Sequence, residues 1–277
     1  MPSDKRQRQD EGRLLRLEAQ RVVDQKDQRK RQVRTLGMIL GGVLLVAGAF
    51  AIFSGHPAND VTTTSSTTAT TAAGGTVVLP KPGKTITGAT PCPAADGSAI
   101  RTTTFAKAPP VCIDPAKSYT ATLVTSEGDI VIQLDAANAP ATVNNFVVLS
   151  RYHFYDNVAF HRIVAGFVNQ AGDPVGPTPG EGGPGYTIPD ELPKVPKTAY
   201  PVGTVAMANT SSPDTGGSQF FLVIGDASGA LSGSGSYSVF GKVVKGQDIS
   251  AAINALGGPD TKPTKSVTIK TVTITET

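Results

Sequence analysis

The chain has 277 residues and a net charge of +3, a length that accommodates one or two domains with a sizeable core. The charge is uneven, because residues 1–35 carry eleven Lys/Arg and six Asp/Glu, which leaves fourteen against sixteen for the rest of the chain. The basic excess therefore belongs to an N-terminal tail. It gives no reason to assign nucleic-acid binding to the remainder, and we expect no nucleic-acid partner.

An apolar run without charges follows this tail at residues 36–53. Its eighteen residues, at about 1.5 Å each, come close to the roughly 30 Å of a bilayer hydrocarbon core. Four basic residues lie within 29–34, and no Lys or Arg follows until Lys81. This asymmetry predicts a single-pass anchor in the cell membrane, with residues 1–35 in the cytoplasm and the rest outside. A cleaved signal peptide is the alternative, since small residues lie at 47–51.

Residues 54–84 are predicted to form a flexible linker, because the Thr-rich stretch 61–71 is of low complexity and poor in large apolar side chains. Residues 85–118 form an extension that holds both cysteines of the chain, Cys92 and Cys112. Outside the cytoplasm an even pair indicates a disulfide, worth about 3 kcal/mol for a loop of this length. Two cysteines without a nearby histidine fall short of a four-ligand metal site, so we expect no metal and no cofactor.

Residues 119–277 have the pattern of a domain rich in β-structure. A Glu-Gly-Asp turn predicts a hairpin over 124–132, and Pro140 lies in the first turn of a predicted helix over 139–151. A second helix is predicted over 247–256, and several short strands separated by Gly/Pro-rich loops lie between the two helices. Many short strands with two helices favour a closed β-barrel capped at its ends.

One arginine lies among apolar residues in the segment 160–170. Phe160, Ile163 and Val164 predict a short, partly buried strand, in which a cation is costly unless it faces a cleft or a partner. Arg162 in such a cleft suits the polarisation of a neutral carbonyl or amide, because its guanidinium is a rigid fork of five donors with a permanent charge. The alternative is an arginine in an ion pair at the edge of the core.

Two amide side chains accompany apolar strands further along, Asn209 after a strand and Gln219 before Phe220 and Phe221. Because adjacent strand residues face opposite sides, only one of these two phenylalanines can face a groove. The sequence shows no Ser–His–Asp set, paired acids or nucleophilic cysteine beside these segments. The pattern predicts a site that binds and polarises its substrate without a covalent intermediate.

Taken in order, these blocks resemble the cyclophilin-type peptidyl-prolyl cis-trans isomerases. They are Phe-His-Arg-Ile-x-x-Gly-Phe-x-x-Gln from Phe160, Met-Ala-Asn from Met207, Gly-Ser-Gln-Phe-Phe from Gly217 and Phe-Gly-x-Val from Phe240. The resemblance begins at about Tyr119 and extends to the C-terminus. It implies a mainly β fold, an eight-stranded antiparallel barrel capped by two helices with the substrate groove on its outer face. With the anchor, the chain looks like a bacterial membrane-anchored form.

The resemblance also implies roles for individual residues. Arg162 would be catalytic, since a guanidinium near the prolyl nitrogen weakens the resonance that opposes rotation of the peptide bond. Phe221 rather than Phe220 would face the groove, and no chemical role is expected for His161. Leu231 or a neighbouring residue would stand where eukaryotic members carry tryptophan. The substrate-binding residues would be Phe167, Val168, Gln170, Ala208, Asn209, Gln219, Phe221, Leu231 and Tyr237.

The expected function is therefore isomerisation of X-Pro peptide bonds in proline-containing polypeptides. Because the domain is predicted to lie outside the cytoplasm, its clients would be extracytoplasmic proteins during folding. The alternative is a catalytically weak chaperone or scaffold module that kept the groove and binds proline peptides without efficient turnover.

Overall fold

The computed structural model describes residues 77–176, 178–195, 200–225, 230–231 and 237–277. All of these residues fall within one compact unit, Thr70–Thr277. The predicted tail (1–35), the predicted anchor (36–53) and most of the predicted linker (54–84) lie outside the described residues. In the part that is described, no helix is long and apolar enough to cross a membrane.

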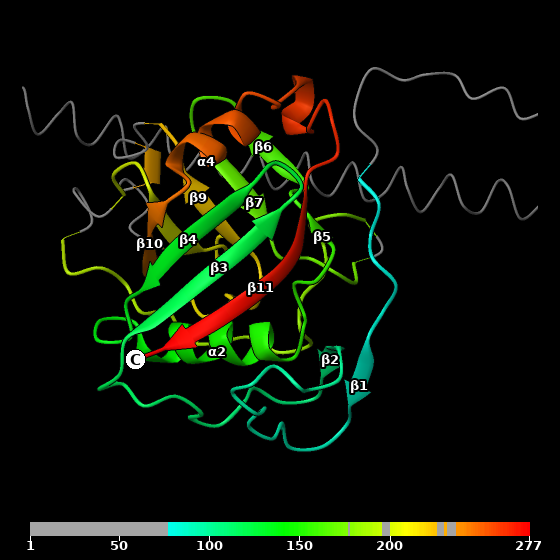
Figure 1. Ribbon diagram of the computed structural model, residues 1–277, viewed down its shortest axis with the longest axis vertical. Coiled ribbons are helices and arrows are strands. Elements are labelled where there is room, and N and C mark those ends of the chain that lie inside the picture. Colours follow the sequence, from blue (N-terminus) through cyan, green and yellow to red (C-terminus); the bar gives the residue numbers. More distant parts are fainter. Residues whose placement is uncertain (1–76, 177, 196–199, 226–229, 232–236) are drawn as a thin grey trace, which may run out of the picture. The chain divides into compact units, whose positions relative to one another are not determined.

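A nine-stranded sheet forms most of this unit (Figure 1). Each pair of neighbouring strands is antiparallel, so hairpins and longer returns connect them. The order across the sheet is β5 (Val158–Ala159), β11 (Thr268–Glu276), β3 (Tyr119–Thr125), β4 (Asp129–Leu134), β10 (Val239–Lys245), β8 (Thr204–Met207), β9 (Phe220–Val223), β7 (Val168–Ala171) and β6 (Arg162–Val164).

The sheet is curled, and it differs from the eight-stranded closed barrel that was expected. Its two outermost strands, β5 and β6, are separated in the chain only by Phe160 and His161. The segment 158–164 pairs first with β11 and then with β7. It is therefore divided into two strands, which raises the number of strands to nine. Among the described strands no hydrogen-bonded ladder joins β5 to β6. The covalent chain itself therefore connects the two ends of the sheet.

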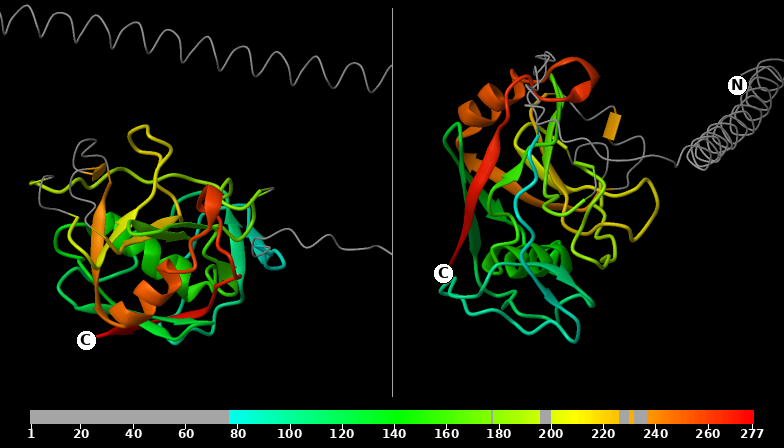
Figure 2. Two further views of the ribbon diagram at one scale, coloured as in Figure 1. Left: turned by 90° about the horizontal axis from the view of Figure 1, so that it is seen from above. Right: turned by 90° about the vertical axis from the view of Figure 1, so that its right-hand side faces the viewer.

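Two helices lie at opposite ends of the sheet, α2 (Pro140–Arg151) and α4 (Gln247–Asn254), as Figures 1 and 2 show. Both were predicted, as was the hairpin now seen between β3 and β4, and α4 ends two residues earlier than expected. A short 3₁₀ turn, η2 (Pro259–Thr261), follows α4. The local sequence signals for a helix start and a tight turn were sufficient for these elements.

Helix α2 obtains its N-terminal cap from a residue distant in the sequence. Ala139 provides no side-chain cap. Instead the carboxylate of Glu191 accepts hydrogen bonds from the N–H groups of Ala141 and Thr142 at 3.0 and 2.8 Å. It satisfies two free donors and places a negative charge at the positive end of the helix dipole.

Aromatic side chains fill the space between α2 and the concave face of the sheet. The ring of Phe146 on α2 lies 5.0 to 5.5 Å from the rings of Tyr155, Phe220 and Phe240, and all four residues are fully buried. On β3 every second residue is buried, as the two-residue period of a strand requires. Because side chains occupy this interior, a substrate site has to lie on the outer face of the sheet.

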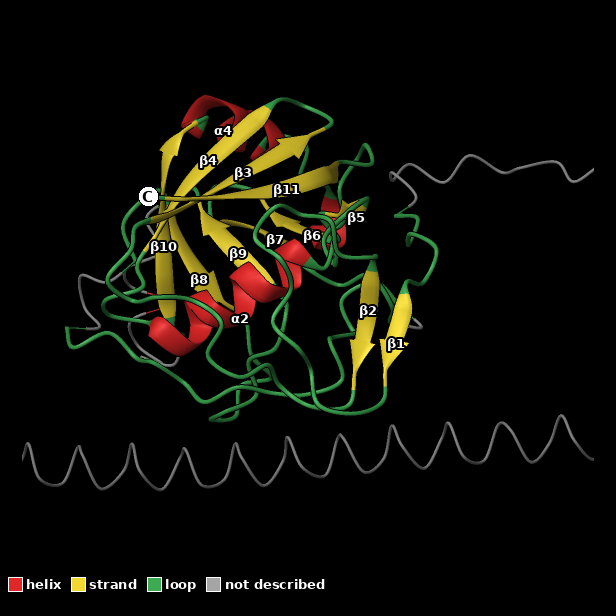
Figure 3. Cartoon of the chain, turned by 60° about the horizontal axis from the view of Figure 1, so that its bottom comes forward, coloured by secondary structure: helices red, strands yellow, loops and turns green. Residues whose placement is uncertain are grey.

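Residues 85–118, which we call the strap, pack against the same core. Most of β1 (Lys84–Ile86) and all of β2 (Thr102–Phe105) lie in it and form a separate parallel ladder (Figure 3). The side chain of Phe105 is 1% exposed, and its ring lies 5.4 Å from that of Tyr152 just after α2. The strap thus contributes an aromatic residue to the hydrophobic core.

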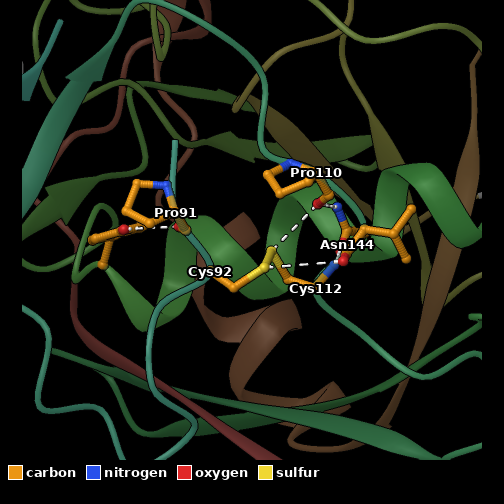
Figure 4. Close-up of a disulfide and its surroundings, with 7 residues drawn as sticks. Pro91, Cys92, Pro110, Cys112 and Asn144 are labelled. Carbon is orange, nitrogen blue, oxygen red and sulfur yellow. Dashed lines mark hydrogen bonds between the residues drawn. A yellow bond between two sulfur atoms is a disulfide. The ribbon is translucent and has the colours of Figure 1, made fainter. Parts of the chain in front are cut away.

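A disulfide between Cys92 and Cys112 closes a loop within the strap (Figure 4). The main-chain N–H of Cys112 donates to the Asn144 side-chain oxygen of α2 at 2.7 Å, and the Asn144 amide donates to the carbonyl of Pro110 at 2.9 Å. On the other side of the bridge the hydroxyl of Tyr152 donates to the carbonyl of Pro91 at 2.9 Å. These contacts fasten the cross-linked loop to α2.

Candidate active site

A row of directly opposed residues crosses five neighbouring strands. Arg162 on β6 is opposite Gln170 on β7, which is opposite Phe221 on β9. Phe221 is in turn opposite Ala206 on β8, and Ala206 is opposite Val239 on β10. Directly opposed residues in a sheet share a face. The long-range pairing therefore places a cation, an amide and an aromatic ring side by side.

The neighbours Phe220 and Phe221 show which face this is. Phe220 is fully buried against Phe146, so it belongs to the interior, as the family resemblance implied. Phe221 points to the opposite side, where its ring meets that of Tyr237 edge-on at 5.3 Å and 87°. The row that contains Arg162 and Phe221 consequently lies on the outer face of the sheet.

A cavity of about 360 Å³ opens on this face. It brings together nine of the ten residues that the sequence predicted for catalysis and substrate binding, and it adds Ala230. Gln219 is the exception, because it lines a neighbouring cavity of about 740 Å³ that shares Gln170, Ala208 and Asn209 with the first. The lining residues of the smaller cavity are Arg162, Phe167, Val168, Gln170, Ala208, Asn209, Phe221, Ala230, Leu231 and Tyr237.

The floor of the smaller cavity is apolar and well packed. Val168, Phe221 and Leu231 are 2%, 4% and 6% exposed, so they present only small patches of surface to the cavity. Tyr200 lies beneath them, is fully buried and donates its hydroxyl hydrogen to the carbonyl of Tyr237 at 3.0 Å. Burial raises the pKa of Tyr200, which keeps the phenol neutral and able to donate. A floor of this kind suits a compact apolar ring.

Tyr200 was not foreseen from the sequence. It precedes β8 in a loop, and no spacing of apolar residues marks it as part of the site. The larger cavity was missed in the same way, because its wall is formed by the glycine-rich segment 180–185. The density of glycines there was the available signal, since residues without a side chain leave the main chain exposed to a ligand.

Arg162 is held by a chain of amide side chains. Its Nη1 donates to Oε1 of Gln170 at 3.2 Å, and Nε2 of Gln170 donates to Oε1 of Gln219 at 3.0 Å. Nε2 of Gln219 donates to the carbonyls of Gly180 and Gly182 at 2.8 and 2.9 Å. In the described part of the chain Arg162 makes no salt bridge, so the alternative of an ion pair at the core edge is not observed. The charge stays available at the cavity rim.

His161 lies next to this chain but carries no charge that would compete with Arg162. Burial lowers the pKa of its imidazole, the carboxylate of Asp173 opposes that effect, and the guanidinium of Arg162 adds to it. Its Nδ1 is buried and has no hydrogen-bond partner among the described residues. The ring leaves no room for a side chain at Gly180, because a Cβ added there would lie 2.9 Å from Cδ2 of His161.

The segment after β8 forms the side of the cavity opposite the apolar floor residues of β7. The N–H of Ala208 donates to the carbonyl of Gln219 at 2.8 Å, which continues the ladder between β8 and β9 beyond its last pair. The side-chain oxygen of Asn209 accepts the N–H of Ser211 at 3.0 Å and so stabilises a turn. The side chain of Asn209 therefore takes part in a turn at the edge of the cavity.

Comparison with known proteins accounts for this arrangement. Residues 120–274 match the family model of the cyclophilin type peptidyl-prolyl cis-trans isomerase/CLD. The chain is 41% identical to a peptidyl-prolyl cis-trans isomerase of Helicobacter pylori over 135 residues, which is 49% of this chain and 78% of that protein. It is 38% identical to peptidyl-prolyl cis-trans isomerase A of Mycobacterium tuberculosis over 179 residues, which is 58% of this chain and 94% of that protein.

Solved structures agree with the sequence comparison. A cyclophilin type peptidyl-prolyl cis-trans isomerase of Cryptosporidium parvum is similar with a TM-score of 0.51 and 29% identity, over 57% of this chain and 98% of that chain. A second structure of that protein, determined in the presence of the dipeptide Ala-Pro, is similar with a TM-score of 0.51 and 30% identity, over 56% of this chain and 98% of that chain.

Proposed function

The chain belongs to the cyclophilin-type peptidyl-prolyl cis-trans isomerases, and on that premise we propose that the cavity of about 360 Å³ on the outer face is the site at which it turns X-Pro bonds. One observation carries the proposal. The Arg162 guanidinium, held by Gln170, stands at the rim of an apolar floor made by Phe221 and Leu231. A cation beside an apolar floor is what a neutral, proline-containing peptide requires.

The proline ring of the substrate occupies the apolar floor. The cavity is large enough for a pyrrolidine ring, and Phe167 and Tyr237 also line it. The residue before proline lies along Ala208 and Asn209, which line the cavity beside this floor. The related Cryptosporidium protein was solved in the presence of Ala-Pro, a proline-containing dipeptide, which supports a substrate of this class.

Arg162 lowers the barrier to rotation. The planar amide is held by resonance between the nitrogen lone pair and the carbonyl, with a barrier of about 18–20 kcal/mol. In the twisted state the lone pair is localised on the prolyl nitrogen, and a guanidinium N–H donor stabilises it there and not in the planar state. Only such differential stabilisation accelerates the step, by a factor of about ten for each 1.36 kcal/mol.

No proton has to be transferred and no covalent intermediate forms in this mechanism. The neutral His161 therefore has no chemical role, and burial, which lowers the pKa of its imidazole, is consistent with this. The activity requires no metal or nucleotide, so it should survive treatment with a chelator. A loss of turnover on chelation that added metal restores would contradict this part of the proposal.

The experiment that tests the proposed site is a protease-coupled assay with an X-Pro peptide on the full chain, with and without Arg162→Ala. Efficient turnover that depends on Arg162 supports it. A chain that binds the peptide but hardly accelerates its isomerisation would instead be a binding module or scaffold that kept the groove.

We further propose that the isomerase acts outside the cytoplasm, tethered to the cell membrane by residues 36–53, and assists the folding of extracytoplasmic proteins. The support is the charge asymmetry around that apolar run and the Cys92–Cys112 disulfide, a bond typical of oxidising compartments. Protease added to intact spheroplasts should then release an active fragment by cutting within the predicted linker, residues 54–84. A domain that stays protected until the membrane is broken would refute this orientation, and a mature protein that begins within residues 47–53 would indicate a cleaved signal peptide.

A further inference from the structure

Asp173 carries a buried carboxylate that the mechanism above does not use. Its residue is 1% exposed, and an ionised group there is costly unless hydrogen bonds replace its water. Oδ1 accepts the N–H groups of Val175 and Gly176 at 3.1 and 2.9 Å. Oδ2 accepts those of Gly180 and Gly182 at 2.7 and 2.9 Å. Two oxygens offer about four acceptor positions, so the carboxylate is fully engaged and has none left for a ligand.

The loop around this carboxylate is built from glycines because the approach is close. A Cβ added to Gly176 would lie 2.6 Å from Oδ2 of Asp173, and one added to Gly182 would collide with Oδ1. Any side chain at these two positions would push the main chain away from the carboxylate. The glycines and the aspartate therefore depend on one another to fix the loop.

The same loop fixes the first amide of the chain that leads to Arg162. Gly180 and Gly182 donate their N–H groups to Asp173 and accept the two hydrogens of the Gln219 amide at their carbonyls. With both donors of Gln219 directed at the loop, its Oε1 must point the other way, where it accepts from Gln170. Gln170 in turn presents its Oε1 to Arg162.

The orientation of the Gln219 and Gln170 amide groups determines whether Arg162 faces an amide oxygen, which attracts it, or an NH₂ group, which repels it. If the Gln219 amide turned over, its NH₂ group would face Gln170, and Gln170 would have to present oxygen to Gln219. Its own NH₂ group would then face the guanidinium of Arg162, a contact between donors alone. The loop carbonyls prevent this reversal, because an amide oxygen cannot replace the amide nitrogen in front of two carbonyl oxygens.

We infer that Asp173 is a positioning residue for the isomerase reaction, because its carboxylate fixes the loop whose carbonyls orient Gln219, Gln170 and finally Arg162. The inference rests on the proposed function of Arg162. Asp173 does not contact the substrate cavities itself, and it acts only through the amide chain.

The test replaces Asp173 with asparagine, which keeps the shape of the side chain and turns one acceptor into a donor. The full chain is studied with a proline peptide by exchange NMR, which gives the catalysed cis–trans rate at saturation, and by titration, which gives the dissociation constant Kd. We expect the rate of Asp173→Asn to fall about tenfold or more with Kd within about twofold, since the apolar floor is intact. The side-chain amide signals of Gln170 and Gln219 should shift.

Glu191→Gln is the matched control, because it makes the same change at a carboxylate that caps α2 and does not touch the amide chain. It should lower the melting temperature and leave the catalysed rate unchanged. Gly182→Ala is a second variant, in which the added Cβ displaces the loop while the carboxylate of Asp173 is kept. It should lose the catalysed rate as well, so it tests the inference even if Asp173→Asn does not fold.

The results separate this inference from the proposed function. If Arg162→Ala is inactive while Asp173→Asn keeps the wild-type rate and unshifted amide signals, the positioning role is wrong and the site stands. The positioning role is also wrong if Asp173→Asn loses activity only in proportion to its unfolded fraction. If Arg162→Ala turns over like the wild type, the proposed function of Arg162 fails first.

Discussion

Removal of the Arg162 side chain should separate catalysis from stability in this site. Arg162 is half-buried, makes one hydrogen bond to Gln170 at 3.2 Å and forms no salt bridge within the described residues. The loss of one such bond at a site open to water should change the free energy of unfolding of Arg162→Ala by about 1 kcal/mol or less.

The effect of Arg162→Ala on the reaction should be far larger. Removing a donor directed at charge that develops in a transition state usually costs about 10²–10³ in rate, or about 2.7–4 kcal/mol. We therefore expect kcat/KM to fall at least about 100-fold. Arg162→Lys should recover little of this loss, because an ammonium lacks the planar fork that reaches Gln170 and the prolyl nitrogen together.

The assay is the protease-coupled measurement of a prolyl peptide, combined with denaturant unfolding of each variant. Lys265→Ala is a suitable control, because it removes a cation that pairs with Glu127 at 2.8 Å on the surface and lines neither cavity. The reasoning fails if Arg162→Ala keeps kcat/KM within about threefold of the wild type, or if its lost activity is explained by a matching loss of stability.

Three further predictions concern the floor, the buried imidazole and the strap. Phe221→Ala should weaken peptide binding, which titration measures. It should lower the free energy of unfolding, measured with denaturant, by less than the roughly 3–5 kcal/mol expected for a phenylalanine buried on all sides, because one side of the ring faces the cavity. The pKa of His161 is lowered from 6.5 in the folded state, so the stability that its neutral form provides should be complete above about pH 6.5 and should be lost as the pH falls below it. Melting curves of His161→Phe should depend less on pH in this range than those of the wild type. Reduction of the Cys92–Cys112 disulfide, or Cys92→Ser, should lower the free energy of unfolding by about 3 kcal/mol. Turnover should persist at temperatures where the protein stays folded. An unchanged melting temperature would contradict a stabilising role for the bond.

The sequence was sufficient for features that depend on neighbouring residues. Pro140 at the helix start and the Glu-Gly-Asp turn located α2 and the β3–β4 hairpin, because such signals act within a few residues. Alternation separated Phe220 from Phe221 for the same reason. The order of the motif blocks then gave the family, and with it nearly all of the residues around the smaller cavity.

Features that depend on distant partners could not be predicted in this way. Glu191 caps a helix from 49 positions away, and nothing near it in the sequence marks it as a cap. Asp173 is a single acid in a glycine-rich loop, and its importance appears only when four main-chain donors are seen to converge on it. The number of strands differed because one short segment changes its partner between β5 and β6, a choice made by the rest of the sheet.

The strap and the larger cavity are connected through two adjacent residues of α2. Asn144 exchanges hydrogen bonds with the strap at Cys112 and Pro110. Asn145 donates to the carbonyl of Gly217 at 2.6 Å and accepts the hydroxyl of Tyr186 at 2.7 Å, and both of these partners line the cavity of about 740 Å³. Neighbouring helix residues point about 100° apart, so one helix can serve both partners at once. Because the disulfide restrains the strap against α2, it also restrains the helix on which this cavity wall depends. The main chain of the row from Arg162 to Phe221 is instead fixed by strand pairing.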